Sequence, residues 1–259
     1  MRWVASTWST SLMEGSALSL SCQWRLKEKC IFCGDEIGAR MLKQGVFHSV
    51  NPGTLTGRWM QQELQKFKAV LDAGVASGTG VDETTLLDWF RQSAEHIALL
   101  AYSTHGVVPT SVGCEIPLGG FRADFAWAAI DIHAAPVIVF IEFEAALVDT
   151  LFEFKRKRST PYIGAAFLEG FSQIVDWCAF GQHEARANPL VSSLLKGAGR
   201  SPIYQFTLIA GLDDFANDPA LIARLTWWKQ NIKYGDGAEM YSFTELVEIG
   251  LRKVGHWVR

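Results

Sequence analysis

The stretch that decides the fold is Val137–Glu144, which reads Val-Ile-Val-Phe-Ile-Glu-Phe-Glu. Its unbroken run of β-branched and aromatic residues predicts a strand in the middle of a sheet, covered on both faces. Side chains alternate along a strand, so Glu142 and Glu144 point to one face and Phe143 points to the other. Two carboxylates on one covered face cost free energy unless solvent, a cation or a metal ion meets them. The end of this strand is therefore the first candidate site.

The segments around this strand alternate between helical and extended patterns. Apolar residues recur at helical spacing over 59–73 and again over 82–100, which opens on a good N-cap. Two extended runs, 111–118 and 121–130, flank a Gly-Gly pair that is typical of a hairpin turn. After the central strand we expect a helix over 161–183, a strand over 203–210, a helix over 218–232, a strand over 239–243 and a capped helix from Ser242 to Val254. This order predicts an α/β fold with a mixed sheet flanked by helices.

The pattern divides the chain into two parts. Residues 1–81 are irregular with one expected helix, whereas 82–259 carry the regular alternation, so we expect an N-terminal extension followed by one domain. A net charge of −3 argues against a general nucleic-acid coat protein but is compatible with one local basic groove. The sequence has no signal-peptide pattern and no apolar stretch of about 20 residues, which predicts a cytoplasmic protein without a membrane partner.

A third acid, Asp124, lies in the second strand of the expected hairpin. If this strand pairs with the central one, Asp124 and Glu142 converge on one point, with Glu144 on the same face as Glu142. Oxygen-only ligands favour Mg²⁺ or Mn²⁺ over zinc. Such an ion can activate a water molecule and stabilise the charge that builds on a phosphodiester during hydrolysis. The alternative, in which these acids are surface charges paired with a residue such as Arg122, stays open.

Gln173 is the fourth candidate for this site. On the expected helix it shares a stripe with Ala166, Gly170 and Trp177, so it points toward the sheet. A buried amide needs partners, so Gln173 is either a satisfied core residue or a support for a metal-bound water, an acidic ligand or a substrate phosphate. Glu115, on the first hairpin strand, is either a further acid near the site or a plain edge charge.

Six short motifs follow one another in a defined order: Gly120–Phe125, Val139–Glu144, Phe152, Gln173–Trp177, Thr207–Gly211 and Met240–Leu246. Together they resemble the C-terminal domain of Shedu antiphage-defence proteins, which belongs to the PD-(D/E)XK nuclease superfamily. The resemblance implies a restriction-endonuclease-like fold and a Mg²⁺- or Mn²⁺-dependent endonuclease that cuts DNA in bacterial defence against phage. It also implies Asp124 and Glu142 as metal ligands and Gln173 as the helix glutamine that supports them.

The sequence departs from the superfamily pattern at Glu144, which stands where that pattern has a lysine. A lysine would stabilise developing negative charge, which a glutamate cannot do. Glu144 would then be a ligand of a second metal ion, and Arg122, Lys155 or Lys157 would supply the positive charge. The expected substrate contacts are Arg122 and the residues Lys155, Arg156 and Lys157 of the only dense basic run.

Other functions stay open on the residues alone. The same fold could form a catalytically inactive domain that binds nucleic acid or a partner protein. A glycosidase is a poor match, because it needs an acid and a base on opposite sides of a sugar. Cys30 and Cys33 provide half of a zinc site, which Cys22 and His48 would have to complete. The expected partner is DNA, and a homo-oligomer is compatible with the sequence.

Overall fold

The computed structural model describes residues 41–131, 133–155, 160–216, 218–231 and 237–256. The chain divides into residues 1–38 and a compact unit, Ala39–Arg259, which contains every element below. The strands are β1 Val46–Ser49, β2 Gly80–Val81, β3 Ser111–Leu118, β4 Phe121–Ala129, β5 Val137–Phe143, β6 Ala146–Leu147, β7 Phe152–Glu153, β8 Tyr162–Ile163, β9 Ile203–Ile209 and β10 Ala238–Tyr241. The α-helices are α1 Gly57–Ser77, α2 Glu83–Phe90, α3 Ala94–His105, α4 Ala165–Asp176, α5 Gln182–Ala187, α6 Pro189–Leu194, α7 Pro219–Asn231 and α8 Phe243–Gly255.

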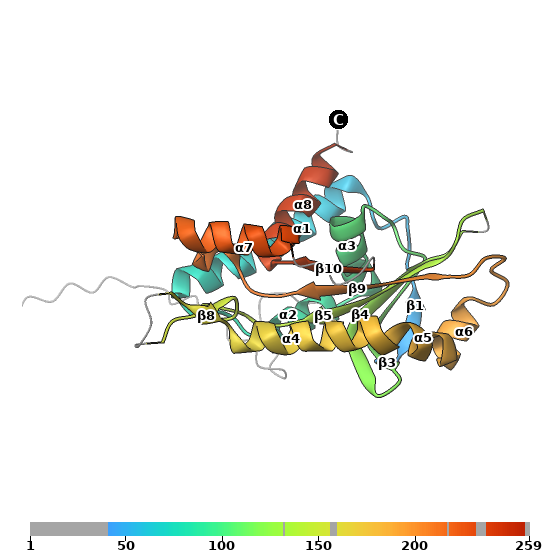
Figure 1. Ribbon diagram of the computed structural model, residues 1–259. Coiled ribbons are helices and arrows are strands. Elements are labelled where there is room, and N and C mark those ends of the chain that lie inside the picture. Colours follow the sequence, from blue (N-terminus) through green and yellow to red (C-terminus); the bar gives the residue numbers. More distant parts are fainter. Residues whose placement is uncertain (1–40, 132, 156–159, 217, 232–236, 257–259) are drawn as a thin grey trace, which may run out of the picture. The chain divides into compact units, whose positions relative to one another are not determined.

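Six strands form the central sheet, in the order β1-β3-β4-β5-β9-β10 (Figure 1). The pairs from β1 to β5 are antiparallel, whereas β9 runs parallel to β5 and β10 parallel to β9. Two short antiparallel pairs, β2 with β6 and β7 with β8, lie outside this sheet. The compact unit is therefore α/β with a mixed sheet, as the sequence predicts.

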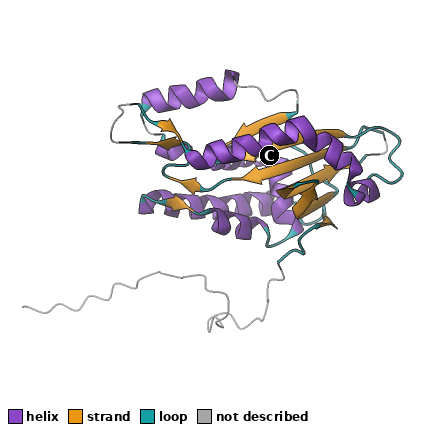
Figure 2. Ribbon diagram, turned by 60° about the horizontal axis from the view of Figure 1, so that its bottom comes forward, coloured by secondary structure: helices purple, strands orange, loops and turns teal. Residues whose placement is uncertain are grey.

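Helices cover both faces of the sheet, with the strands between them (Figures 1 and 2). Helices α1, α2, α3 and α8 pack on one face, which receives Val139, Ile141 and Phe143 of β5. Helices α4 to α7 pack on the other face, which receives Ile138 and Phe140. Because both faces of β5 are buried, its apolar run is continuous rather than alternating, as expected for a central strand.

Turn and capping residues in the sequence correctly predicted where several strands and helices begin or end. Gly119 has a φ of 63° at the turn between β3 and β4, where glycine is favoured. Asp82 caps α2 by accepting a hydrogen bond from the Thr85 N–H at 2.9 Å. Ser242 and Glu245 form the capping box expected at the start of α8.

Two expected helices differ from the structure. The helix expected over 82–100 is two helices, because Ser93 caps a new start at α3 after α2 ends at Phe90. The helix expected from Pro161 begins at Ala165, after β8, and a π-helical turn over Trp177–Gly181 separates α4 from α5. Apolar spacing alone could not show these breaks, since the same face stays buried across them.

The compact unit extends further toward the N-terminus than the boundary expected after residue 81. Strand β1 pairs with β3, and α1 packs on α8, where a Cβ atom on Gly250 would lie 2.9 Å from Leu64. Strand β1 has only four residues, too few to give a recognisable period. In the described part of the chain, no helix has the length and apolar character to cross a membrane.

Candidate active site

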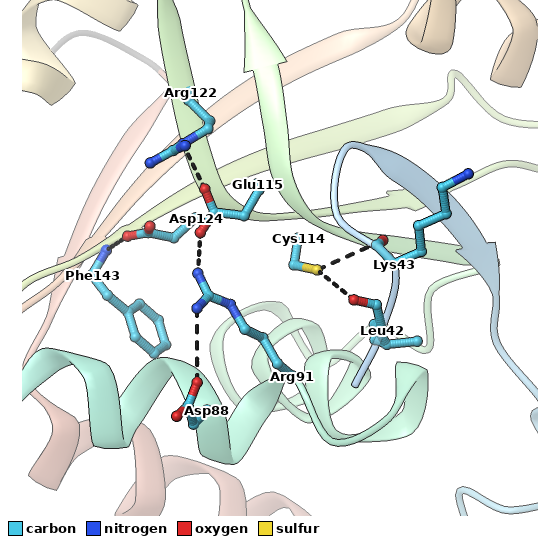
Figure 3. A network of polar contacts seen from close by, with 9 residues as sticks. All are labelled: Leu42, Lys43, Asp88, Arg91, Cys114, Glu115, Arg122, Asp124 and Phe143. Carbon is cyan, nitrogen blue, oxygen red and sulfur yellow. Dashed lines mark hydrogen bonds and ion pairs between the residues drawn. The ribbon is translucent and has the colours of Figure 1, made fainter. Parts of the chain in front are cut away.

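Asp124 lies at the point where strands β4 and β5 part. The backbone pairing between these strands ends at Phe125 and Ile141. One step further, the N–H of Phe143 donates to Asp124 Oδ2 at 2.9 Å (Figure 3), so the carboxylate replaces a backbone carbonyl as the acceptor. This bond fixes Asp124 beside β5. The predicted pairing of the two strands is confirmed, and it brings Asp124 and Glu142 together.

Glu142 and Glu144 both turn to the face that α4 covers, as alternation along the strand predicts. Each is only 7% exposed. Glu142 accepts a hydrogen bond from the side chain of Gln173, which therefore points inward as expected. Glu144 lies against Gly170, where a Cβ atom would be 2.6 Å from Glu144 Cγ. The close approach of α4 to this glutamate thus depends on a residue without a side chain.

The three acids resist ionisation. Burial raises the pKa of Asp124 to about 7, and the nearby Glu83 and Glu115 add to the effect, whereas the Phe143 N–H opposes it. Burial, followed by repulsion from Asp124 and Glu144, raises the pKa of Glu142 to about 9. Burial and the charges of Glu83 and Glu169 raise the pKa of Glu144 to about 8. Such shifts mean that negative charge gathers here without enough positive charge to balance it.

The geometry fits a cation only after side chains adjust. Glu142 Oε2 is buried and has no hydrogen-bond partner among the described residues, which leaves one carboxylate oxygen available as a ligand. Yet no three His, Cys, Asp or Glu side chains in the described ranges are already grouped as ligands of one ion. An ion shared by Asp124, Glu142 and Glu144 would therefore draw these carboxylates closer together.

Two further acids, Glu83 and Glu169, join this cluster and were not selected from the sequence. The pairing of β2 with β6 places the start of α2 next to the chain that follows β5. Gly80 permits this contact, because its φ is +90° and a Cβ atom there would lie 2.1 Å from the carbonyl oxygen of Ala146. Burial raises the pKa of Glu83, and Glu169 raises it further. Only the tertiary pairing reveals Glu83, since nothing in its local pattern points to the site.

Glu115 is not an edge charge. It is 9% exposed and forms ion pairs with Arg91, from the end of α2, and with Arg122, from β4 (Figure 3). Arg91 was not among the residues selected from the sequence. Its charge opposes the rise in the pKa of Asp124 and of Glu83. Arg91 therefore supplies a buried positive charge beside the acids.

The remaining basic candidates are either paired with other residues or outside the described ranges. Lys155 Nζ is 3.0 Å from Glu153 Oε2 and 5.4 Å from the centre of the Tyr162 ring, so its charge is engaged locally. Arg156 and Lys157 lie outside the described residues, as do Cys22, Cys30 and Cys33. His48 Nε2 contacts the carbonyl oxygen of Lys43 at 2.9 Å.

Comparison with known protein families found no matching family model, and comparison with curated proteins found no matching sequence.

Proposed function

We propose that this chain is a Mg²⁺- or Mn²⁺-dependent endonuclease that hydrolyses phosphodiester bonds in DNA. The observation that carries the proposal is the group of three carboxylates, Asp124, Glu142 and Glu144, at the diverging ends of two central strands. All three have raised pKa values, and one buried oxygen of Glu142 has no hydrogen-bond partner in the described part of the chain. A site with this excess of negative charge is most stable with a cation bound.

Asp124 and Glu142 would hold the ion, and Glu144 would complete its ligands or hold a second ion. A bound divalent ion would activate water and neutralise charge on the phosphate. The protein contributes the orientation of its own groups. The Phe143 N–H orients Asp124, and Gln173 orients Glu142 while it stabilises the ionised form.

The order of elements supports a restriction-endonuclease-like fold for this domain. The antiparallel β3–β4 hairpin, the central strand β5, helix α4 and the parallel strand β9 follow one another and surround the acids. The motif resemblance to Shedu proteins supports DNA as the substrate and defence against phage as the setting.

Plasmid cleavage tests the proposal. Purified protein should nick or linearise plasmid DNA with Mg²⁺ or Mn²⁺ and not with EDTA. Asp124→Asn should lower the rate by more than about a hundredfold, because a ligand matters at least as much as the groups that orient ligands. The matched control is Glu248→Gln on the exposed side of α8, which should leave the rate unchanged. Cleavage that persists in Asp124→Asn would remove this active site.

A second candidate function is a nuclease-fold domain without catalysis that binds nucleic acid or a partner protein. Two observations favour it: Glu144 stands where a lysine would stabilise the transition state, and the acids are not already grouped around one ion. Calorimetry separates the two functions. Absence of Mn²⁺ binding together with intact DNA binding would favour the second candidate.

A further inference from the structure

Two arginines share one buried carboxylate beside the acid site. Arg91 is 12% exposed, and its Nη2 donates a hydrogen bond to Glu115 Oε1. Arg122 is 69% exposed, and its Nε lies 2.5 Å from Glu115 Oε2. Within the described residues, Oε2 accepts no hydrogen bond of good geometry. The buried arginine is thus held by a directional bond, and the exposed one by charge alone.

The backbone at Glu115 is held in an unusual conformation. Its φ is 54°, the left-handed region, and no other non-glycine residue in the described ranges has a positive φ. Such a conformation is unfavourable for a residue with a side chain, and it is often found at functional sites. Here it points the carboxylate between the two arginines rather than along the regular strand. The pairs on either side, Cys114 with Phe125 and Ile116 with Ala123, place Glu115 opposite Asp124.

Because of this arrangement, Arg122 can leave Glu115 at a lower free-energy cost than Arg91 can. If Arg122 left, Arg91 would still balance the charge of Glu115, so no buried carboxylate would remain alone. If Arg91 left, Glu115 would remain buried beside Asp124, with only an exposed partner. Glu115 links Arg122 to Asp124, since it pairs with Arg122 and its charge acts on Asp124 (Figure 3), so a phosphate that reaches Asp124 would come near this guanidinium. A phosphate can accept two parallel hydrogen bonds from one guanidinium, as a carboxylate does.

We propose that Glu115 is a positioning residue that pairs with Arg122 in place of a substrate phosphate and so holds Arg122 at the acid site until a DNA phosphate takes over this guanidinium, while Arg91 keeps Glu115 fixed. This inference rests on the proposed function, because it takes DNA as the ligand. It assigns to Arg122 the contact with the phosphate next to the bond that is cut. Glu115 itself competes with the substrate and does not take part in hydrolysis.

DNA binding in EDTA tests the exchange without cleavage. Fluorescence anisotropy with a labelled duplex should show that Glu115→Gln binds about fivefold more tightly than the wild type, the factor that corresponds to removing one partly exposed competing ion pair. This gain should vanish in the double variant Glu115→Gln/Arg122→Gln. The matched control is Asp72→Asn, which releases exposed Lys68 from a similar pair on α1 and should leave the affinity unchanged.

A measurement on the wild type covers the case in which Glu115→Gln does not fold. The ¹H–¹⁵N signal of Arg122 Nε, assigned by its absence in Arg122→Lys, should shift when duplex DNA is added, and that of Arg91 should stay in place. Binding without any shift of Arg122, or a folded Glu115→Gln variant that binds no tighter than the wild type, would overturn the exchange while DNA binding stands. If neither the wild type nor any variant binds duplex DNA, the proposed DNA substrate fails as well.

Discussion

Two groups of acids in this molecule each contain a carboxyl whose pKa is raised by burial, but the groups differ in charge balance. Around Lys229, between α7 and the start of α8, Glu245 Oε2 lies 2.6 Å and Asp213 Oδ1 3.6 Å from the Lys229 ammonium. Glu245 also accepts the N–H of Ser242 in the capping box. Burial raises the pKa of Asp213, but Lys229 and the Ser242 hydroxyl act against this rise. This group is a structural ion pair with its own cation.

Within the described ranges, no lysine or arginine pairs with the acids at the end of β5 in this way. Asp124, Glu142 and Glu144 repel one another, and Arg91, the buried positive charge nearby, is already paired with Glu115. A carboxyl pKa that is raised by burial therefore does not by itself indicate a site. What distinguishes the β5 group is that no lysine, arginine or histidine among the described residues forms an ion pair with its three acids, which fits the proposed cation site.

The largest expected difference between the two groups is in metal affinity. Titration calorimetry with Mn²⁺ should show that Glu142→Gln lowers the affinity by more than about tenfold. This change removes a ligand, and loss of a residue that only orients a ligand already costs about that factor. Glu245→Gln, the same change in the group with its own cation, should leave the affinity as in the wild type. Equal losses in both variants would mean that the β5 group is not a metal site.

Stability without metal should change in opposite directions in the two groups. Lys229→Met should lower the free energy of unfolding by about 2 kcal/mol, less than the cost of breaking a fully buried pair, since Lys229 and its partners are partly exposed. Glu142→Gln should raise it by about 1 to 2 kcal/mol at pH 8, because it removes a carboxyl whose ionisation the fold opposes. Urea unfolding in EDTA measures both changes.

The increase in the free energy of unfolding that we expect from Glu142→Gln should grow as the pH rises. Because the pKa of Glu142 is raised from 4.5 to about 9 in the fold, the protonated carboxyl favours the folded state, and this contribution is complete below pH 4.5. It is lost as the pH rises through the range from 4.5 to 9. The variant should therefore unfold at the same urea concentration as the wild type near pH 4 and at a higher one near pH 9. A gain that did not grow with pH would contradict the raised pKa.

The smallest expected effects concern the hydrogen bonds that support each group. Ser242→Ala should lower the free energy of unfolding by about 1 kcal/mol, as loss of an N-cap does, and leave Mn²⁺ binding unchanged. Gln173→Ala should change stability less but weaken Mn²⁺ binding by about tenfold, because Gln173 orients Glu142. Thermal unfolding and calorimetry on the same samples separate these outcomes. Unchanged Mn²⁺ binding in Gln173→Ala would make this residue an ordinary core glutamine.

Much of the fold can be predicted from short-range patterns. The apolar run of β5, the glycine turn between β3 and β4 and the caps at Asp82 and Ser242 are all local signals, and the structure agrees with each. The break between α2 and α3 could not be predicted in the same way. The apolar face continues through it, and a serine cap was the only sign.

The sequence by itself determined that Glu142 and Glu144 share a face and that Gln173 turns toward it. These are consequences of strand and helix periods, which any chain with these residues must obey. Only the tertiary structure decided that Glu83, Glu115 and Arg91 belong to the same neighbourhood. Their positions depend on the pairing of β2 with β6, on the left-handed backbone at Glu115 and on where α2 ends. Contacts between segments that are distant in the sequence leave no periodic pattern of residues. The charge balance of the site therefore could not be predicted from the sequence and is given only by the tertiary structure.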